Sequence, residues 1–181
     1  MVRYLVLIGS ALLVACSAAA EPTPFPYFNK EGGRIRDMAN LLSPEVEGHL
    51  TDQLDRAEAS YGPQMAVVTV DSLHDYSIED FSLFYARAWS LGDKVRNDGM
   101  LLLVAPNERK VRIEIGKGIE DTFTDVYCKE VIDHAIIPRF KEGDFEAGIT
   151  AGVDELVTHM REHPTLPAND NAAQPAAAKA A

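Results

Sequence analysis

The chain has 181 residues, of which 46% are hydrophobic and 25% are charged, and its formal net charge at pH 7 is −11. This composition is that of an average globular protein, and the length fits one domain. The acidic balance argues against nucleic acid and against electrostatic docking to anionic lipid, whereas divalent cations or basic partners are compatible with it.

The N-terminal segment has the layout of a secretory signal peptide, with one positive charge, Arg3, followed by an apolar run over residues 4–15. That run is about a dozen residues long, against the roughly 20 that a membrane-spanning helix needs. Residues 13–16 read Leu-Val-Ala-Cys and resemble the bacterial lipobox. By that resemblance the signal peptide is residues 1–15, and Cys16 becomes the lipid-carrying first residue.

Acyl chains on Cys16 would anchor the exported protein to the envelope membrane. Ser17 follows the cysteine and resembles the outer-membrane sorting pattern, so we expect the protein to face the periplasm. The alternative is an ordinary signal peptide cut near residues 18–20, with Cys16 discarded. Lipidation of Cys16 leaves Cys128 without a partner inside the chain, which excludes a disulfide framework.

Two further segments lie outside the expected core. Residues 16–33 contain three closely spaced prolines and two glycines, and we expect them to form an extended tether. Residues 163–181 are rich in alanine and proline, lack the apolar surface needed to fold, and are expected to be disordered. A single domain over residues 34–162 remains.

Periodicity and capping residues predict the elements of this domain. Ser43 followed by Pro44 is a helix start, and Ser77 is a second N-cap. The first long strand is nearly continuous in apolar residues, which suits a buried, partly parallel strand. Pro138 is expected to end the third helix. The expected strands are 34–37, 64–70, 100–105 and 110–115, and the expected helices are 43–61, 77–89, 125–137 and 145–161.

This order of elements predicts an α/β fold, a three-layer α/β/α sandwich with a small mixed β-sheet of Rossmann-like type. The first strand–helix–strand unit should be parallel and right-handed, and the hairpin adds an antiparallel strand. Trp89 should be buried between the second helix and the sheet. Cys128 fits the core as an inert packed thiol, with a reactive thiol as the alternative.

Six segments carry motifs in a characteristic order: Asp-Met-Ala-Asn-Leu-Leu-Ser at 37–43, Gln-Met-Ala-Val-Val-Thr-Val at 64–70, Ala-Trp-Ser-Leu-Gly at 88–92, Asn-Asp-Gly at 97–99, Ile-Gly-Lys-Gly-Ile-Glu at 115–120, and Arg-Phe-Lys-Glu-Gly-Asp-Phe at 139–145. Together they resemble the TPM domain over about residues 35–157. Lys117 and Asp121 depart from the family pattern. The resemblance implies export or membrane tethering, calcium binding, weak acid-phosphatase activity, and a role in the upkeep of membrane protein complexes.

The residues themselves predict an acidic site at one edge of the sheet. The loop over 92–99 precedes one hairpin strand and the loop over 116–124 follows the other, so both should lie at the same edge. Clustered carboxylates with free backbone carbonyls suit a hard cation such as Ca²⁺ or Mg²⁺. The alternative is a solvated acidic rim with helix-capping roles. The acids expected to converge are Asp37, Asp98, Glu120, Asp121 and Asp125.

Other motifs are weaker. Gly116-Lys117-Gly118 lacks a third glycine and the Lys-Ser/Thr pair of a phosphate loop, so no nucleotide is expected. His159 and His163 are four residues apart, but we interpret all five histidines as surface residues. Two classes of function remain. The first is a cation-stabilised module that binds an envelope protein partner, and the second is a metal-dependent phosphatase with Asp37, Asp98 or Asp125 as catalytic candidates.

Overall fold

A mixed four-stranded sheet with strand order β1-β2-β3-β4 forms the middle layer of the computed structural model, which describes residues 33–165. β1, β2 and β3 are mutually parallel, and β4 is antiparallel to β3. The short first strand does join the sheet, as the sequence predicted. The strands are β1 (Ile35–Asp37), β2 (Gln64–Thr69), β3 (Gly99–Ala105) and β4 (Lys110–Ile115).

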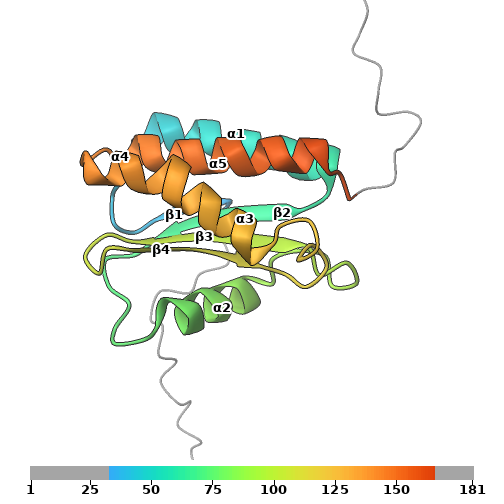
Figure 1. Cartoon of the computed structure of the whole chain (residues 1–181), viewed down its shortest axis with the longest axis horizontal. Coiled ribbons are helices and arrows are strands. Elements are labelled where there is room, and N and C mark those ends of the chain that lie inside the picture. Colours follow the sequence, from blue (N-terminus) through green and yellow to red (C-terminus); the bar gives the residue numbers. More distant parts are fainter. Residues whose placement is uncertain (1–32, 166–181) are drawn as a thin grey trace, which may run out of the picture.

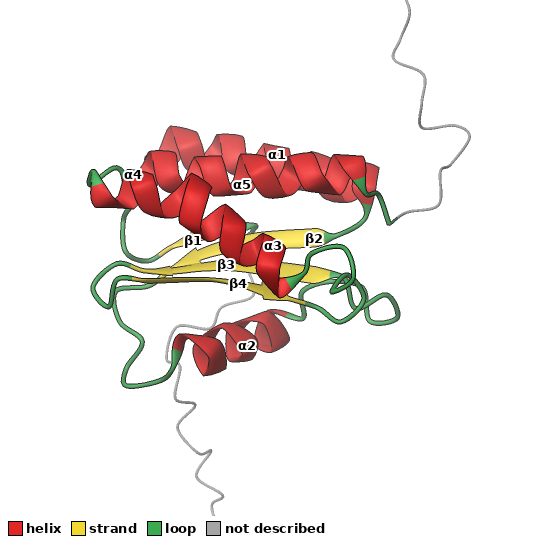
Figure 2. Cartoon of the chain, in the orientation of Figure 1, coloured by secondary structure: helices red, strands yellow, loops and turns green. Residues whose placement is uncertain are grey.

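Helices cover both faces of the sheet (Figure 1). α2 packs on one face, and α1, α5 and the helical segment from α3 to α4 pack on the other (Figure 2). The predicted three-layer α/β/α fold is therefore confirmed. The helices are α1 (Pro44–Tyr61), α2 (Ile78–Trp89), α3 (Asp125–Val131), α4 (Ile137–Lys141) and α5 (Phe145–Glu162), and a π-helical turn, η1 (Ile132–Ile136), joins α3 to α4.

The helix starts follow from the capping residues. The Ser43 hydroxyl accepts a hydrogen bond from the Val46 N–H, and the Ser77 hydroxyl accepts one from the Asp80 N–H. Each cap satisfies a backbone donor that the first turn of a helix leaves unpaired.

The prediction that Pro138 ends the third helix is wrong. The chain widens into η1, where the Ile137 N–H donates to the Ile132 carbonyl five residues back. Pro138 then falls in the first turn of α4, where its missing N–H costs no intrahelical hydrogen bond. The helical path therefore continues past the proline to Lys141 before it turns into α5.

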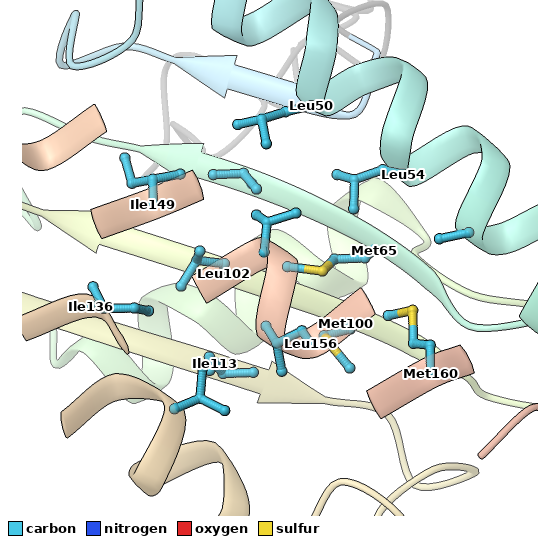
Figure 3. Packing of buried hydrophobic residues seen from close by; sticks show 14 of the residues in the cluster. Leu50, Leu54, Met65, Met100, Leu102, Ile113, Ile136, Ile149, Leu156 and Met160 are labelled. Carbon is cyan, nitrogen blue, oxygen red and sulfur yellow. The ribbon is translucent and has the colours of Figure 1, made fainter. Parts of the chain in front are cut away.

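Two buried clusters lie on either side of the sheet. The larger one packs α1, α5 and η1 against β2, β3 and β4, and Figure 3 shows side chains such as Leu54, Leu102 and Leu156 meeting there. The smaller cluster contains Trp89, which is 8% exposed, beneath α2. Cys128 is buried in the larger cluster. The predicted core positions of Trp89 and Cys128 are thus confirmed.

The direction of the strands gives the sheet two distinct edges. The amino edge is where β2 and β3 begin and β4 ends, and the carboxyl edge is where β1, β2 and β3 end and β4 begins. The described chain ends near the amino edge, because the Thr165 N–H donates to the Tyr61 carbonyl, just before β2. It begins beside the middle of β2, where the Arg34 carbonyl accepts from the Val67 N–H. Within residues 33–165, no helix has both the length and the apolar character needed to span a bilayer.

Candidate functional site

The two loops that the sequence placed together do meet at the amino edge. The Gly116 N–H donates to the Gly99 carbonyl (2.8 Å), and the Gly118 N–H donates to the Asn97 carbonyl (2.9 Å). Glycine is required at this contact, because a Cβ on Gly118 would lie 1.6 Å from the Arg96 carbonyl oxygen. The hairpin β3–β4 therefore brings the loops over 90–98 and 116–124 into backbone contact.

Asp98 holds the first of these loops closed. Its side chain is 1% exposed, and one carboxylate oxygen accepts from the Asp93 N–H (2.8 Å) while the other accepts from Arg96 Nε (2.6 Å). The Asp93 carboxylate in turn accepts from the Arg96 and Val95 N–H groups, and these hydrogen bonds lower the pKa of Asp93. Both oxygens of Asp98 are therefore already used within the loop.

Asp37 lies at the opposite edge of the sheet, so the prediction that it faces the same edge as Asp98 is wrong. It pairs with Thr69 at the carboxyl end of β1, whereas the Asp98 carbonyl bonds the Gln64 N–H at the start of β2. Five residues of strand separate these positions, which is about 16 Å. The reason is topological: a residue between a parallel strand and the next helix lies at the carboxyl edge, and one before a parallel strand lies at the amino edge.

Asp37 has a structural role where it stands. One carboxylate oxygen accepts from the Leu42 N–H (2.8 Å), and the other accepts from the Thr69 hydroxyl. These bonds tie the turn before α1 to the ends of β1 and β2.

The remaining predicted acids are exposed. Glu120 and Asp121 lie in the 116–124 loop, and Asp125 lies in the first turn of α3, where a negative charge suits the helix dipole. The N-cap of α3 is Thr124, whose hydroxyl accepts from the Tyr127 N–H. None of the five predicted acids belongs to a group of three potential metal ligands within 4.8 Å in the described part of the chain. As placed here, they do not fit one common cation site.

A smaller pocket of about 270 Å³, lined by both apolar and charged residues, lies at the amino edge. The second half of α2, both loops and the end of β4 line it, and its charged groups are of both signs. Arg87 and Lys117 face it together with Glu114 and Glu120. Glu114 accepts from Arg112 Nε (2.7 Å) and from the Ser82 hydroxyl (3.0 Å), so one of these carboxylates is already paired.

A larger cavity of about 550 Å³ lies at the carboxyl edge, and we name it the carboxyl-edge cleft. The end of β3 and the start of β4 form one wall, and α4 with the first residue of α5 forms the other. Its lining combines apolar side chains with three cations and contains no acid. The lining residues are Val104, Ala105, Pro106, Arg109, Lys110, Val111, Ile137, Phe140, Lys141 and Phe145.

The cleft residues were missed at the level of sequence. The segment 106–109 predicts only a turn, and Lys141 entered only as part of a family motif. The signal that could have found them is the rule that ligands of open α/β sheets bind outside the carboxyl ends of the strands. Applied to β3, that rule points to Arg109 and Lys110, two adjacent cations in a strongly acidic chain.

The fold and these motifs define a small α/β domain with a mixed four-stranded sheet. The family model for the TPM domain matches residues 35–159. The chain belongs to the TPM domain family, as its motifs predicted.

Solved structures agree with this assignment. The N-terminal domain of a protein from P. gingivalis is 32% identical, with a TM-score of 0.68 over 74% of this chain and 87% of that one. A protein from the psychrophilic bacterium Bizionia argentinensis shares the fold at 22% identity, with a TM-score of 0.62 over 76% of this chain and 94% of that one. The N-terminal domain of a Corynebacterium glutamicum protein also shares the fold, at 17% identity and with a TM-score of 0.56 over 75% of this chain and 84% of that one. No curated protein matches the chain.

Proposed function

We propose that this chain is a TPM-domain binding module of the bacterial envelope, and that its carboxyl-edge cleft binds an acidic segment of another envelope protein. The observation that carries the proposal is the charge of the cleft. Arg109, Lys110 and Lys141 line it, and within residues 33–165 none of the three forms a salt bridge with an acid. In a chain with a net charge of −11, an unpaired cationic patch favours an anionic ligand.

The apolar part of the cleft favours a peptide segment over a free inorganic anion. The rings of Phe140 and Phe145 lie 4.9 Å apart, centroid to centroid, and both line the cavity. An apolar or aromatic side chain would bury surface against these rings while neighbouring carboxylates pair with the cations at the rim.

A crosslinking experiment tests this binding. A photoreactive phenylalanine analogue at Phe145, in cells that carry the full chain, should form an adduct with an envelope protein at an acidic segment. Lys141→Glu should abolish the adduct, whereas Lys94→Glu, a matched charge reversal in an exposed loop at the amino edge, should leave it unchanged. An adduct that survives Lys141→Glu, or that forms equally from a probe at the exposed Val95, would contradict the proposal.

The proposal includes anchoring by acyl chains on Cys16, at the outer membrane and facing the periplasm. Cys16 and the preceding signal peptide lie outside the described residues, and the lipobox resemblance supports this part. Cys16→Ser should release the protein from the membrane fraction or block its processing. Normal maturation and continued fractionation with the outer membrane would refute the anchor.

Binding of Ca²⁺ or Mg²⁺ stays a prediction. Its remaining candidate ligands are the exposed carboxylates of Glu120, Asp121 and Asp125, which would have to move together around the ion. A bound cation should raise the melting temperature, because a ligand at 100 times its dissociation constant stabilises a fold by about 2.7 kcal/mol. The double variant Glu120→Gln, Asp121→Asn should lose that increase. Equal melting of the wild type in Ca²⁺, Mg²⁺ and chelator would identify these acids as a solvated rim.

Phosphatase activity is the second candidate. The observation that favours it is the pair of cations, Arg87 and Lys117, beside Asn97 in the amino-edge pocket, since such groups can hold phosphate oxygens. Purified protein should then hydrolyse a generic phosphomonoester, and Lys117→Ala should reduce the rate. No turnover with Mg²⁺, with Ca²⁺ or with chelator would leave the binding module as the function.

A further inference from the structure

We propose that the end of α5 is a binding site for a transition-metal ion of the Zn²⁺, Ni²⁺ or Cu²⁺ class. His159, Glu162 and His163 each offer one ligand atom, and these atoms all lie within 4.8 Å of one another. The spacing i, i+3, i+4 places the three side chains on one face at the last helical turn. We name this group the α5 histidine site. From the sequence, both histidines were expected to be surface residues; His163 is exposed, whereas His159 is half-buried.

His159 is prepared for metal binding by its own hydrogen bond. Its Nε2 lies 3.0 Å from the Thr122 carbonyl oxygen, and since a carbonyl only accepts, Nε2 carries the proton in this pair. The other ring nitrogen, Nδ1, then keeps its lone pair for a metal. Metal-binding histidines in proteins characteristically donate their second nitrogen to a carbonyl or carboxylate in this way.

Aromatic packing fixes the orientation of the same ring. The ring of Tyr127 stacks on His159 at a centroid distance of 4.0 Å and an interplanar angle of 22°. The ring of Phe123 meets it edge-on at 4.9 Å. A ligand held on two sides loses little side-chain freedom when it binds an ion, so its affinity is higher than that of a free surface histidine.

The other two ligands lie on the solvent side of this fixed ring. His163 is the C-cap residue of α5, its N–H donates to the His159 carbonyl (3.0 Å), and the two imidazole centroids are 4.4 Å apart. The chain just beyond is held as well, because the Thr165 N–H donates to the Tyr61 carbonyl (2.8 Å). Glu162 and His163 are exposed, which leaves their side chains free to turn toward an ion and leaves a further coordination position for water.

The donor set selects the class of metal. Two imidazole nitrogens and one carboxylate suit borderline ions such as Zn²⁺, Ni²⁺ and Cu²⁺, whereas Ca²⁺ and Mg²⁺ prefer sites made of oxygen ligands. The α5 histidine site is therefore separate from the acidic site predicted from the sequence. Through the hydrogen bond from His159 to Thr122, a bound ion would also brace the 116–124 loop against α5.

Calorimetric titration of the chelator-treated full chain with Zn²⁺ tests the proposal. We expect one equivalent to bind, His163→Ala to weaken the affinity at least tenfold, and Glu162→Gln to weaken it less. His49→Ala, at an exposed histidine on α1, is the matched control and should bind like the wild type. A hundredfold excess of Mg²⁺ should not displace Zn²⁺.

A second readout locates the ion without relying on a variant that could disturb the fold. Substoichiometric Cu²⁺ should broaden the NMR signals of His159, His163 and the Thr122 amide before those of His49 or His134. Equal zinc affinity in the wild type and His163→Ala would overturn the proposal. So would broadening that begins at other histidines, or the absence of any zinc binding at millimolar concentration.

Discussion

The contact between the amino-edge loops can be tested with one methyl group. In Gly118→Ala, the new Cβ would lie 1.6 Å from the Arg96 carbonyl oxygen, where real Cβ contacts are essentially never under 3.0 Å. The obstacle is backbone, which cannot rotate away as a flexible side chain would. The two loops must therefore separate by more than 1 Å, which strains or breaks the hydrogen bond from the Gly118 N–H to the Asn97 carbonyl.

The cost of that separation has two parts. A lost backbone hydrogen bond costs about 0.5–1.5 kcal/mol, and forcing packed groups apart costs about 1–3 kcal/mol. The reduced backbone entropy of the unfolded alanine variant offsets about 0.4–1 kcal/mol. We expect Gly118→Ala to lower the free energy of unfolding by about 2 kcal/mol, a large share of the roughly 5–15 kcal/mol that domains have.

Urea denaturation, followed by the fluorescence of the buried Trp89, measures this change. The matched control is Gly48→Ala in α1, where a Cβ would meet nothing within 4 Å. It should raise the free energy of unfolding by about 0.5–1 kcal/mol, because alanine is the better helix former. If the free energy of unfolding of Gly118→Ala lies within about 0.5 kcal/mol of the wild-type value, the loops are not packed as described and the reasoning fails.

Three other predictions follow from buried groups. Trp89→Ala should cost about 3–5 kcal/mol in the same denaturation assay, and a loss under about 1 kcal/mol would place the indole at the surface. Burial raises the pKa of the Cys128 thiol from 9.0 to about 11. The fraction of Cys128 present as thiolate at pH 8 should therefore fall about 100-fold on folding. A disulfide reagent should react with Cys128 about 100-fold more slowly in the native protein than in the urea-unfolded protein. Asp98→Asn should lower the melting temperature equally in Ca²⁺, Mg²⁺ and chelator, because it breaks hydrogen bonds made within the chain; a drop seen only with a cation would show that Asp98 binds metal.

Local sequence signals were sufficient to predict the helices and strands, but not to predict at which edge of the sheet a given residue lies. Serine caps and apolar periodicity predicted helix starts and strands, because each depends on neighbouring residues. Pro138 misled the prediction because a π-helical turn, set by packing against α5, places the proline where its missing N–H does no harm. Asp37 was misplaced because proximity to a helix start in sequence does not determine which end of a parallel strand a residue occupies.

The cleft illustrates a second limit. Arg109 follows β3 and Lys141 ends α4, so 32 positions separate two cations that line one cavity. No periodicity links residues so far apart, and only the fold, which places α4 across the cleft from the start of β4, brings them to one cavity. The contact between the 90–98 and 116–124 loops was predictable because a hairpin, which is a local feature, determines it.

The position of Thr165 determines how the domain can be attached to a surface or a label. Thr165 lies at the end of the sheet away from the cleft, close to the start of β2. A fluorescent protein or an affinity tag fused directly after Thr165 would attach behind the binding face and leave its entrance open. Immobilising the domain through that position on a sensor chip would present the carboxyl-edge cleft outward to a ligand in solution.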